Sequence, residues 1–168
     1  MNKTKKITLT GIMAAQITVM TAYFFHIPVG MNGGYIHFGD ALIFLSATLL
    51  PCPYAMVAAA IGGGLADLLT APMWIPVTVV VKILLVPAFD YKAPKIITMR
   101  NMVALLLGYF ISFFGYFLGE YLIFGTWAVL LVSMFNNFIQ FVGSAVVFLV
   151  LGTVFDKAGI KVRFFYNE

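Results

Sequence analysis

The sequence has few charged residues and almost no cysteine. Only 10% of its 168 residues are Asp, Glu, Lys or Arg, whereas an ordinary soluble domain carries about 25%. A water-soluble fold would lack the polar side chains to cover its surface, which argues against soluble enzymes, nucleic-acid-binding domains and disordered linkers. The one cysteine, Cys52, excludes an internal disulfide and a metal site built from several cysteines.

Apolar residues are abundant instead, at 62% of the chain, and the mean hydropathy is +1.03. A membrane-spanning helix needs about 20 mostly apolar residues, and six stretches separated by Pro, Gly or charge are candidates. We predict an all-α integral membrane protein, a single membrane domain over residues 1–168 that forms a compact bundle of six transmembrane helices. The predicted helices are residues 7–26, 38–50, 54–71, 73–89, 98–124 and 126–155.

The first apolar stretch follows a basic start, as a secretory signal peptide does. Its run of about 19 apolar residues is longer than the 7–15 usual in a signal peptide, and no small-x-small cleavage site follows it. We therefore interpret this stretch as a retained first helix.

The basic residues predict the orientation of the bundle. The connections 27–37, 71–73 and 125–126 contain no Lys or Arg, so we expect them outside, with both termini in the cytoplasm. A five- or seven-helix count would place one basic group outside. Nine of the ten basic residues lie before the first helix, around the fourth-to-fifth connection or after the sixth helix: Lys3, Lys5, Lys6, Lys92, Lys95, Arg100, Lys157, Lys161 and Arg163.

Ionisable and amide side chains inside the predicted spans mark a candidate binding site, because such groups are costly in a bilayer. Their spacing places them in the outer half of the bundle, and the polar residues of the sixth helix, from Ser133 to Ser144, share one face. A ligand arriving from outside would also meet the Gly-rich loop after the first helix. The predicted substrate-binding residues are Tyr35, His37, Asp67, Lys82, Glu120, Asn136, Asn137 and Gln140.

Each of these residues also has a purely structural interpretation. The Asn and Gln side chains can link helices by hydrogen bonds, and Asp67 with Lys82 can form a structural ion pair. We expect Asp40, near the outer boundary with His37, to cap the second helix, because Asp is a favoured N-cap residue. No metal site and no catalytic residue is predicted.

Small residues predict where helices pack closely. Gly63 shares a stripe with Asp67 on the third helix, and Gly108, Gly115 and Gly119 share a face of the fifth. On the first helix, small side chains permit close approach of another helix, either within the bundle or from a partner. These candidate interface residues are Gly11, Ala14, Ala15 and Thr18.

The chain resembles the substrate-binding S components of energy-coupling factor (ECF) vitamin transporters over essentially its whole length. The most specific stretches are residues 35–42 (YIHFGDAL), 62–69 (GGGLADLL) and 76–82 (PVTVVVK). Their order is similar to the subgroup linked with hydroxymethylpyrimidine and pyridoxine. Gly11-x-x-x-Ala15 resembles the family's small-xxx-small contact with a transmembrane coupling subunit, and residues 30–37 correspond to the loop that closes the family's binding site.

The resemblance implies binding and carriage rather than catalysis. A small, mostly neutral B-vitamin or precursor would enter from outside, and the loaded chain would dock on the coupling subunit, topple and release it inside. Two partner ATP-binding cassette ATPases would hydrolyse ATP, because this sequence has no P-loop motif. We expect no cofactor on this chain. The alternatives are a structural or channel-like small membrane subunit and an intramembrane enzyme.

Overall fold

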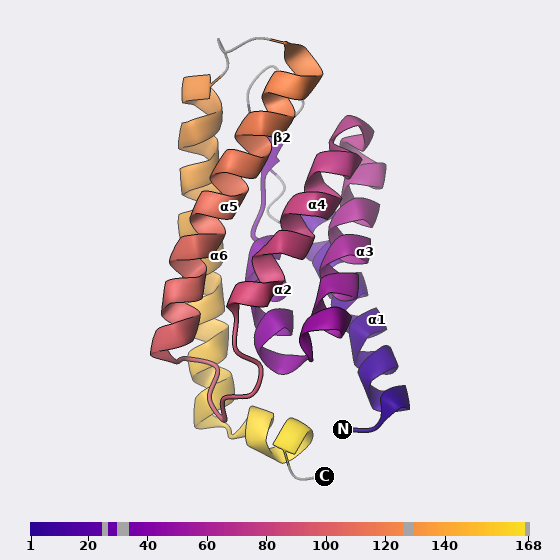
Figure 1. The fold of residues 1–168 in the computed structure, drawn as a ribbon, viewed down its shortest axis with the longest axis vertical. Helices are drawn as coiled ribbons and strands as arrows, with labels where there is room; N and C mark the ends of the chain where they lie inside the picture. Colours follow the sequence, from indigo (N-terminus) through magenta and orange to yellow (C-terminus); the bar gives the residue numbers. More distant parts are fainter. Residues whose placement is uncertain (25–26, 30–33, 126–129, 167–168) are drawn as a thin grey trace.

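The computed structural model describes residues 1–24, 27–29, 34–125 and 130–166. Side chains of residues 27–29, 34–36, 130–134 and 165–166 lie outside this description. Six α-helices and one β-hairpin form an elongated bundle, with both termini at the same end (Figure 1). The helices are α1 (Lys3–Ala22), α2 (Gly39–Leu49), α3 (Cys52–Thr70), α4 (Ile75–Leu85), α5 (Met99–Phe124) and α6 (Leu130–Lys157), and the strands are β1 (Ile27–Val29) and β2 (Gly34–Ile36).

A helix is present in each of the six predicted stretches, and local sequence explains where several of them begin and end. Asn2 caps α1 by accepting a hydrogen bond from the Lys5 amide at 2.9 Å. Thr98 caps α5 in the same way. Gly125 ends α5 at a φ of 64°, a left-handed conformation that glycine adopts readily. Short 3₁₀ turns, Pro72–Trp74 and Val86–Ala88, extend α4 at both ends.

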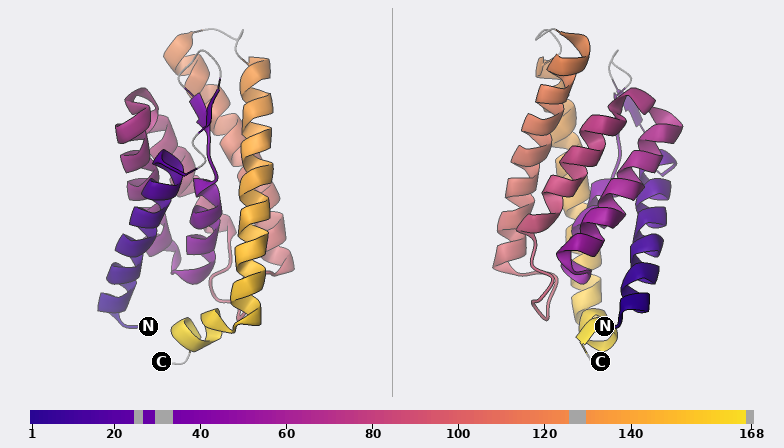
Figure 2. Two further views of the ribbon diagram at one scale, coloured as in Figure 1. Left: turned by 180° about the vertical axis from the view of Figure 1, so that it is seen from behind. Right: turned by 45° about the vertical axis from the view of Figure 1, so that its right-hand side comes forward.

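The predicted boundaries of the first helix were wrong, whereas the described chain is helical as predicted, apart from one short hairpin. The helix begins at Lys3 and ends at Ala22, because Asn2 provides an N-cap ahead of the lysines. The chain then forms an antiparallel hairpin in which Ile27 pairs with Ile36. Figure 2 shows this hairpin between α1 and α6 at the end of the bundle away from the termini.

Helix lengths in the described chain suit a membrane protein. Three helical segments are long and apolar enough to cross a bilayer, namely Cys52–Thr70, Met99–Phe124 and Phe135–Lys157, while Gly39–Leu49 and Pro72–Ala88 are shorter apolar helices. At 11 residues, α2 is only about 16 Å long, against about 30 Å of hydrocarbon. The chain after β2 runs down between the helices, so α2 starts inside the bundle (Figure 1).

Glycines bring the helices into close contact, as their spacing predicted. A Cβ atom at Gly63 of α3 would lie 3.1 Å from Cγ of Lys82, so the lysine stem packs directly on the α3 backbone. On α5, a side chain at Gly119 would meet Val77 at 2.6 Å, and one at Gly115 would collide with Val81. These contacts confirm the predicted packing faces of α3 and α5.

We call the half of the bundle that contains both termini the terminal half, and the other the distal half. Phe44, Phe89 and Phe148 fill the core of the terminal half, with ring centroids 5.3–6.0 Å apart. The chain between α4 and α5 is fastened to α6, because Asp156 accepts hydrogen bonds from the amides of Ile96 and Ile97 at 2.7 and 2.9 Å.

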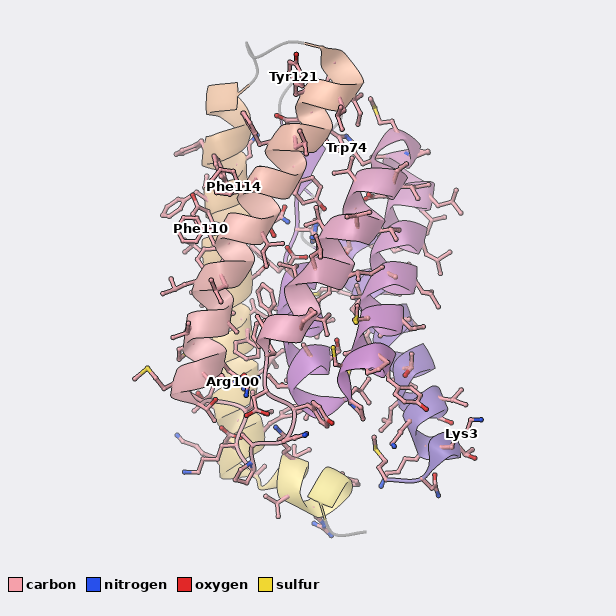
Figure 3. The ribbon with its side chains drawn as sticks, viewed as in Figure 1. Lys3, Trp74, Arg100, Phe110, Phe114 and Tyr121 are labelled. Carbon is pink, nitrogen blue, oxygen red and sulfur yellow. The ribbon has the colours of Figure 1, made fainter. Side chains whose placement is uncertain are left out.

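Side chains also distinguish the two ends and the outer surface of the bundle. Lys3 and Arg100 lie near the termini, whereas Trp74 and Tyr121 lie at the distal end (Figure 3). Phe110 and Phe114 of α5 point away from the bundle and are more than half exposed. Exposed aromatic side chains on a bundle this apolar are the surface that a bilayer would cover.

Candidate functional site

A buried ion pair lies at the base of the distal half, where α2, α4 and α6 meet. Nζ of Lys82 donates to Oδ1 of Asp40 at 2.5 Å. The second carboxylate oxygen of Asp40 accepts a hydrogen bond from Nε2 of Gln140 at 3.2 Å. Lys82 is 1% exposed, Asp40 4% and Gln140 9%, so the three side chains are closed off from solvent. They link the start of α2 to the last turn of α4 and to the first half of α6.

The structure corrects the predicted roles of Asp40. Phe38, not Asp40, occupies the N-cap of α2, and no side chain caps that end. Among the described side chains, Lys82 forms its ion pair with Asp40 rather than with Asp67. Both predictions were wrong because they placed residues 37–40 at the outer boundary, whereas the extended chain after β2 carries them into the bundle.

His37 is buried at the same level, at 5% exposure, and is therefore not at the outer boundary either. Its Nδ1 accepts a hydrogen bond from the Gly39 amide at 3.0 Å. This contact orients the imidazole ring against the first residue of α2. Gly39 has no room for a side chain, because a Cβ atom there would collide with the hydroxyl of Thr21 on α1.

A polar and aromatic row continues from the ion pair along α4 toward the distal end. Nζ of Lys82 lies 5.3 Å from the ring centroid of Tyr116, and the Tyr116 hydroxyl shares a hydrogen bond with Thr78 at 3.1 Å. The ring of Trp74 meets Tyr116 edge-on at 6.0 Å and lies 6.1 Å from Phe124. Trp74, Thr78 and Lys82 are all buried, which confirms that their i, i+4, i+8 spacing marks an inward face.

Among the described residues, the buried Nε1 of Trp74 and Oγ of Ser144 have no hydrogen-bond partner. A buried donor or acceptor left unpaired costs about 1–3 kcal/mol. The indole N–H of Trp74 is therefore a hydrogen-bond donor that a bound molecule could satisfy.

The remaining predicted site residues lie around this row at different depths. Asp67 is buried on α3, one turn beyond Gly63, while Glu120, Asn136 and Asn137 are only partly buried. The backbone of Tyr35 is part of β2. The described part of the chain does not include the side chains of Tyr35 and Ser133, or residues His26, 30–33 and Trp127.

Sequence reasoning missed several members of the site. Tyr116 was not identified, although it carries a hydroxyl group on an apolar helix and directly follows Gly115. Trp74 and Thr78 were placed on the face of Lys82 but were not assigned to the site. Asp40 was assigned to a helix cap because it lies 42 residues from Lys82 in the sequence. Only the fold shows that the two side chains are in contact.

The four candidate interface residues of α1 lie in two different environments. Gly11 and Ala15 are exposed. Ala14 is buried against α3, and the Thr18 hydroxyl contacts the Ala14 and Gly62 carbonyls at 2.9 and 3.1 Å. Gly11 and Ala15 therefore face outward, and Ala14 and Thr18 contribute to packing within the bundle.

Comparison with known proteins gives two findings. A family model described as "ECF-type riboflavin transporter, S component" matches residues 1–157. The chain is also similar to an uncharacterized protein of Pyrococcus woesei, with 26% identity over 141 residues, which is 82% of this chain and 93% of that protein.

Proposed function

Since the chain belongs to the ECF-type riboflavin transporter S component family, we propose that it captures a small B-vitamin or vitamin precursor at the outer face of a membrane. Members of this family are membrane components of vitamin transporters rather than enzymes. Family membership implies association with a coupling module that contains a membrane subunit and ATPases. The chain would deliver its substrate through that module.

The observation that carries the proposal is the gathering of buried polar side chains in the distal half. Four helices contribute buried side chains, Asp40 from α2, Asp67 from α3, Lys82 from α4 and Gln140 from α6, and α5 adds the partly buried Tyr116. The terminal half holds the Phe44, Phe89 and Phe148 core at the corresponding depth. A channel would need polar lining through its whole length, so a polar cluster in one half above an aromatic core favours a binding site over a channel-like or structural subunit.

The proposed topology is six spans with both termini in the cytoplasm of a bacterial cell. Support comes from the two ends of the bundle: nine of the ten basic residues belong to the termini or to the α4–α5 connection, which lie at the same end. Cytoplasmic ends of membrane proteins carry such an excess of Lys and Arg. The distal half would then open to the outside, where the vitamin arrives.

The proposed substrate is hydroxymethylpyrimidine, pyridoxine or a similar small vitamin, with riboflavin as the alternative that the matching family's description names. The resemblance of residues 35–42, 62–69 and 76–82 to the pyrimidine and pyridoxine subgroup supports the smaller compounds. Amide groups such as Gln140 can pair with ring nitrogens and hydroxyls, and buried aromatic rings can stack on a heterocycle.

The proposed coupling surface is the exposed pair Gly11 and Ala15 on α1. Small residues four apart let a second helix approach closely in a membrane. ATP would be hydrolysed by the two ATP-binding cassette ATPases of the partner module, because this sequence carries no P-loop motif.

A binding panel tests the proposal. The protein purified alone in detergent is titrated with pyridoxine, hydroxymethylpyrimidine, thiamin and riboflavin, and we expect saturable binding of one of them. Gln140→Ala and Asn137→Ala should weaken that binding while the variants stay folded by circular dichroism. No binding to any member, together with no ATPase co-purifying from the source cells, would overturn the proposed function.

A further inference from the structure

The last described residues of the chain cross the terminal end of the bundle. Gly159, at a φ of 62°, lets the chain turn away from α6. Residues 160–166, which we call the C-terminal segment, then run from the end of α6 toward the start of α1 (Figure 1). Because the segment lies across the helices rather than along them, it would lie in the plane of a membrane that the bundle spans.

Two contacts hold the C-terminal segment against the bundle. Nζ of Lys5 on α1 donates a hydrogen bond to the Phe164 carbonyl at 2.8 Å. The Lys161 side chain is only 1% exposed, so it is covered at the end of the bundle. The three side chains that follow are exposed instead, with Val162 at 41% and Phe164 at 54% on either side of Arg163. The segment therefore presents apolar and basic side chains together, away from the bundle.

A second exposed cation lies close to this surface. Lys157 is the last residue of α6 and is exposed. The chain between Lys157 and Arg163 is folded on itself, because the Gly159 amide donates to the Asp156 carbonyl at 3.2 Å and the Arg163 amide donates to the Gly159 carbonyl at 3.0 Å. The two cations thus flank one tight turn.

The described carboxylates of the terminal end are engaged elsewhere. Asp156 accepts hydrogen bonds from two backbone amides of the α4–α5 connection, and Asp90 lies 3.6 Å from Arg100. Arg163 and Lys157 form no ion pair with a described side chain. Their positive charge is therefore available to a partner that brings negative charge.

We propose that the C-terminal segment is an in-plane membrane anchor, which inserts Val162 and Phe164 between lipids and binds the phosphate of an anionic phospholipid through Arg163 and Lys157. Apolar side chains beside cations suit the boundary between headgroups and acyl chains, where each kind meets its own partner. An acidic protein surface would satisfy the cations but leave the exposed apolar side chains unexplained. The inference goes beyond the proposed function, because it does not depend on what the distal half binds.

Two lipids with the same acyl chains test the headgroup preference. The wild-type protein in detergent is titrated with dioleoyl phosphatidylglycerol or dioleoyl phosphatidylcholine while its unfolding temperature is followed. We expect half-maximal stabilisation at an about tenfold lower concentration of the anionic lipid. An equal response to both lipids would overturn the proposal and assign the basic surface to an acidic protein partner. Inorganic phosphate should not stabilise the protein, and an equal shift with phosphate alone would also overturn the lipid site.

Matched double variants separate a local site from the general charge of the terminal end. Arg163→Gln with Lys157→Gln should bring the responses to the two lipids within about twofold of each other. The control, Lys92→Gln with Lys95→Gln, removes two exposed charges from the α4–α5 connection and should retain the preference. An equal loss of preference in both double variants would show that net charge alone is responsible and would overturn the site.

Spin labels test whether the segment enters the membrane. A nitroxide is attached to Phe164→Cys in a chain with Cys52→Ala, reconstituted in vesicles that contain phosphatidylglycerol, and Lys92→Cys is the exposed control. We expect the label at position 164 to collide more with oxygen than with a water-soluble nickel chelate, and the label at position 92 to do the reverse. Equal accessibility of both labels to the chelate would overturn the anchor.

Discussion

The two halves of the bundle are held together by different chemistry. In the terminal half, three phenylalanine rings pack on one another, and Asp156 and Asn101 bind backbone groups of the α4–α5 connection. In the distal half, the contacts join side chains of different helices, above all Lys82 with Asp40. Backbone hydrogen bonds and ring packing fix the arrangement of the helices in the terminal half. The side-chain contacts of the distal half instead gather polar atoms where a ligand could bind. The proposed binding site lies in the distal half, and we expect both halves to contribute to stability by these different contacts.

The largest effect is expected from breaking the distal ion pair. Lys82→Met leaves Asp40 buried without its cation, which should lower the free energy of unfolding by about 3–5 kcal/mol and abolish ligand binding. Denaturant unfolding in mixed micelles measures the first and titration the second. The control, Asp40→Leu with Lys82→Met, should recover most of the stability, because an apolar replacement of a whole buried pair is often neutral. Equal stability of the single and double variants would contradict the argument.

A smaller loss, confined to stability, is expected in the terminal half. Phe148 is fully buried, and Phe148→Ala should cost about 3 kcal/mol through the cavity it leaves. Ligand affinity at a temperature where the variant is folded should be unchanged, because Phe148 lies away from the distal side chains. Phe148→Leu, which fills most of the space, is the matched control. A tenfold loss of affinity in Phe148→Ala would remove the distinction between the halves.

Lys161 gives a pH-dependent test at the terminal end. Its side chain is buried, and Nζ has no hydrogen-bond partner among the described residues. Burial lowers the pKa of this ammonium from 10.5 to about 8, although the carboxylates of Asp90 and Asp156 act in the opposite direction. The unfolded chain therefore binds more protons between these values, so stability should rise as the pH rises from 8 to 10.5.

Lys161→Met should accordingly raise the unfolding temperature at pH 7, where the wild-type lysine is charged and buried. The difference should shrink as the pH rises toward 10.5, because the lysine of the folded protein is then neutral and that of the unfolded chain is about half neutral. Scanning calorimetry of both proteins at pH 7, 8.5 and 10 measures it, with Lys157→Met as the control. A constant difference across this range would show that packing, not charge, is responsible.

The smallest effect on stability is expected on the exposed face of α1. Gly11→Leu and Ala15→Leu add side chains where the structure has open surface, so the free energy of unfolding should change by no more than about 0.5 kcal/mol. Vitamin binding should persist, while uptake in cells that contain the coupling module should be lost. Gln16→Leu, on another exposed part of α1, should leave uptake intact. Loss of binding in Gly11→Leu would mean that this face serves the bundle itself.

Much of the fold could be predicted from the sequence, because each helix is an apolar run bounded by Pro, Gly or a capping residue. The packing faces were also readable, since Gly115 and Gly119 occur at the spacing of one helix face and contact α4 as expected. The hairpin was missed because residues 27–36 have no alternating pattern long enough to indicate a strand.

The site was only partly predictable, because the sequence does not show how deep in the bundle each polar side chain lies. Lys82 and Gln140 were identified because a polar group in an apolar helix is conspicuous. The position of Asp40 depends on how far the chain after β2 enters the bundle, which no local pattern records. The length of α2 was the available signal: a helix of 11 residues cannot reach from one face of a bilayer to the other.

The short α2 also has a consequence for how the protein is made. Asp40 leaves the ribosome 42 residues before Lys82 and 100 residues before Gln140. A carboxylate in hydrocarbon without a partner is costly, so we expect α2 to reach its final depth only after α4 has entered the membrane.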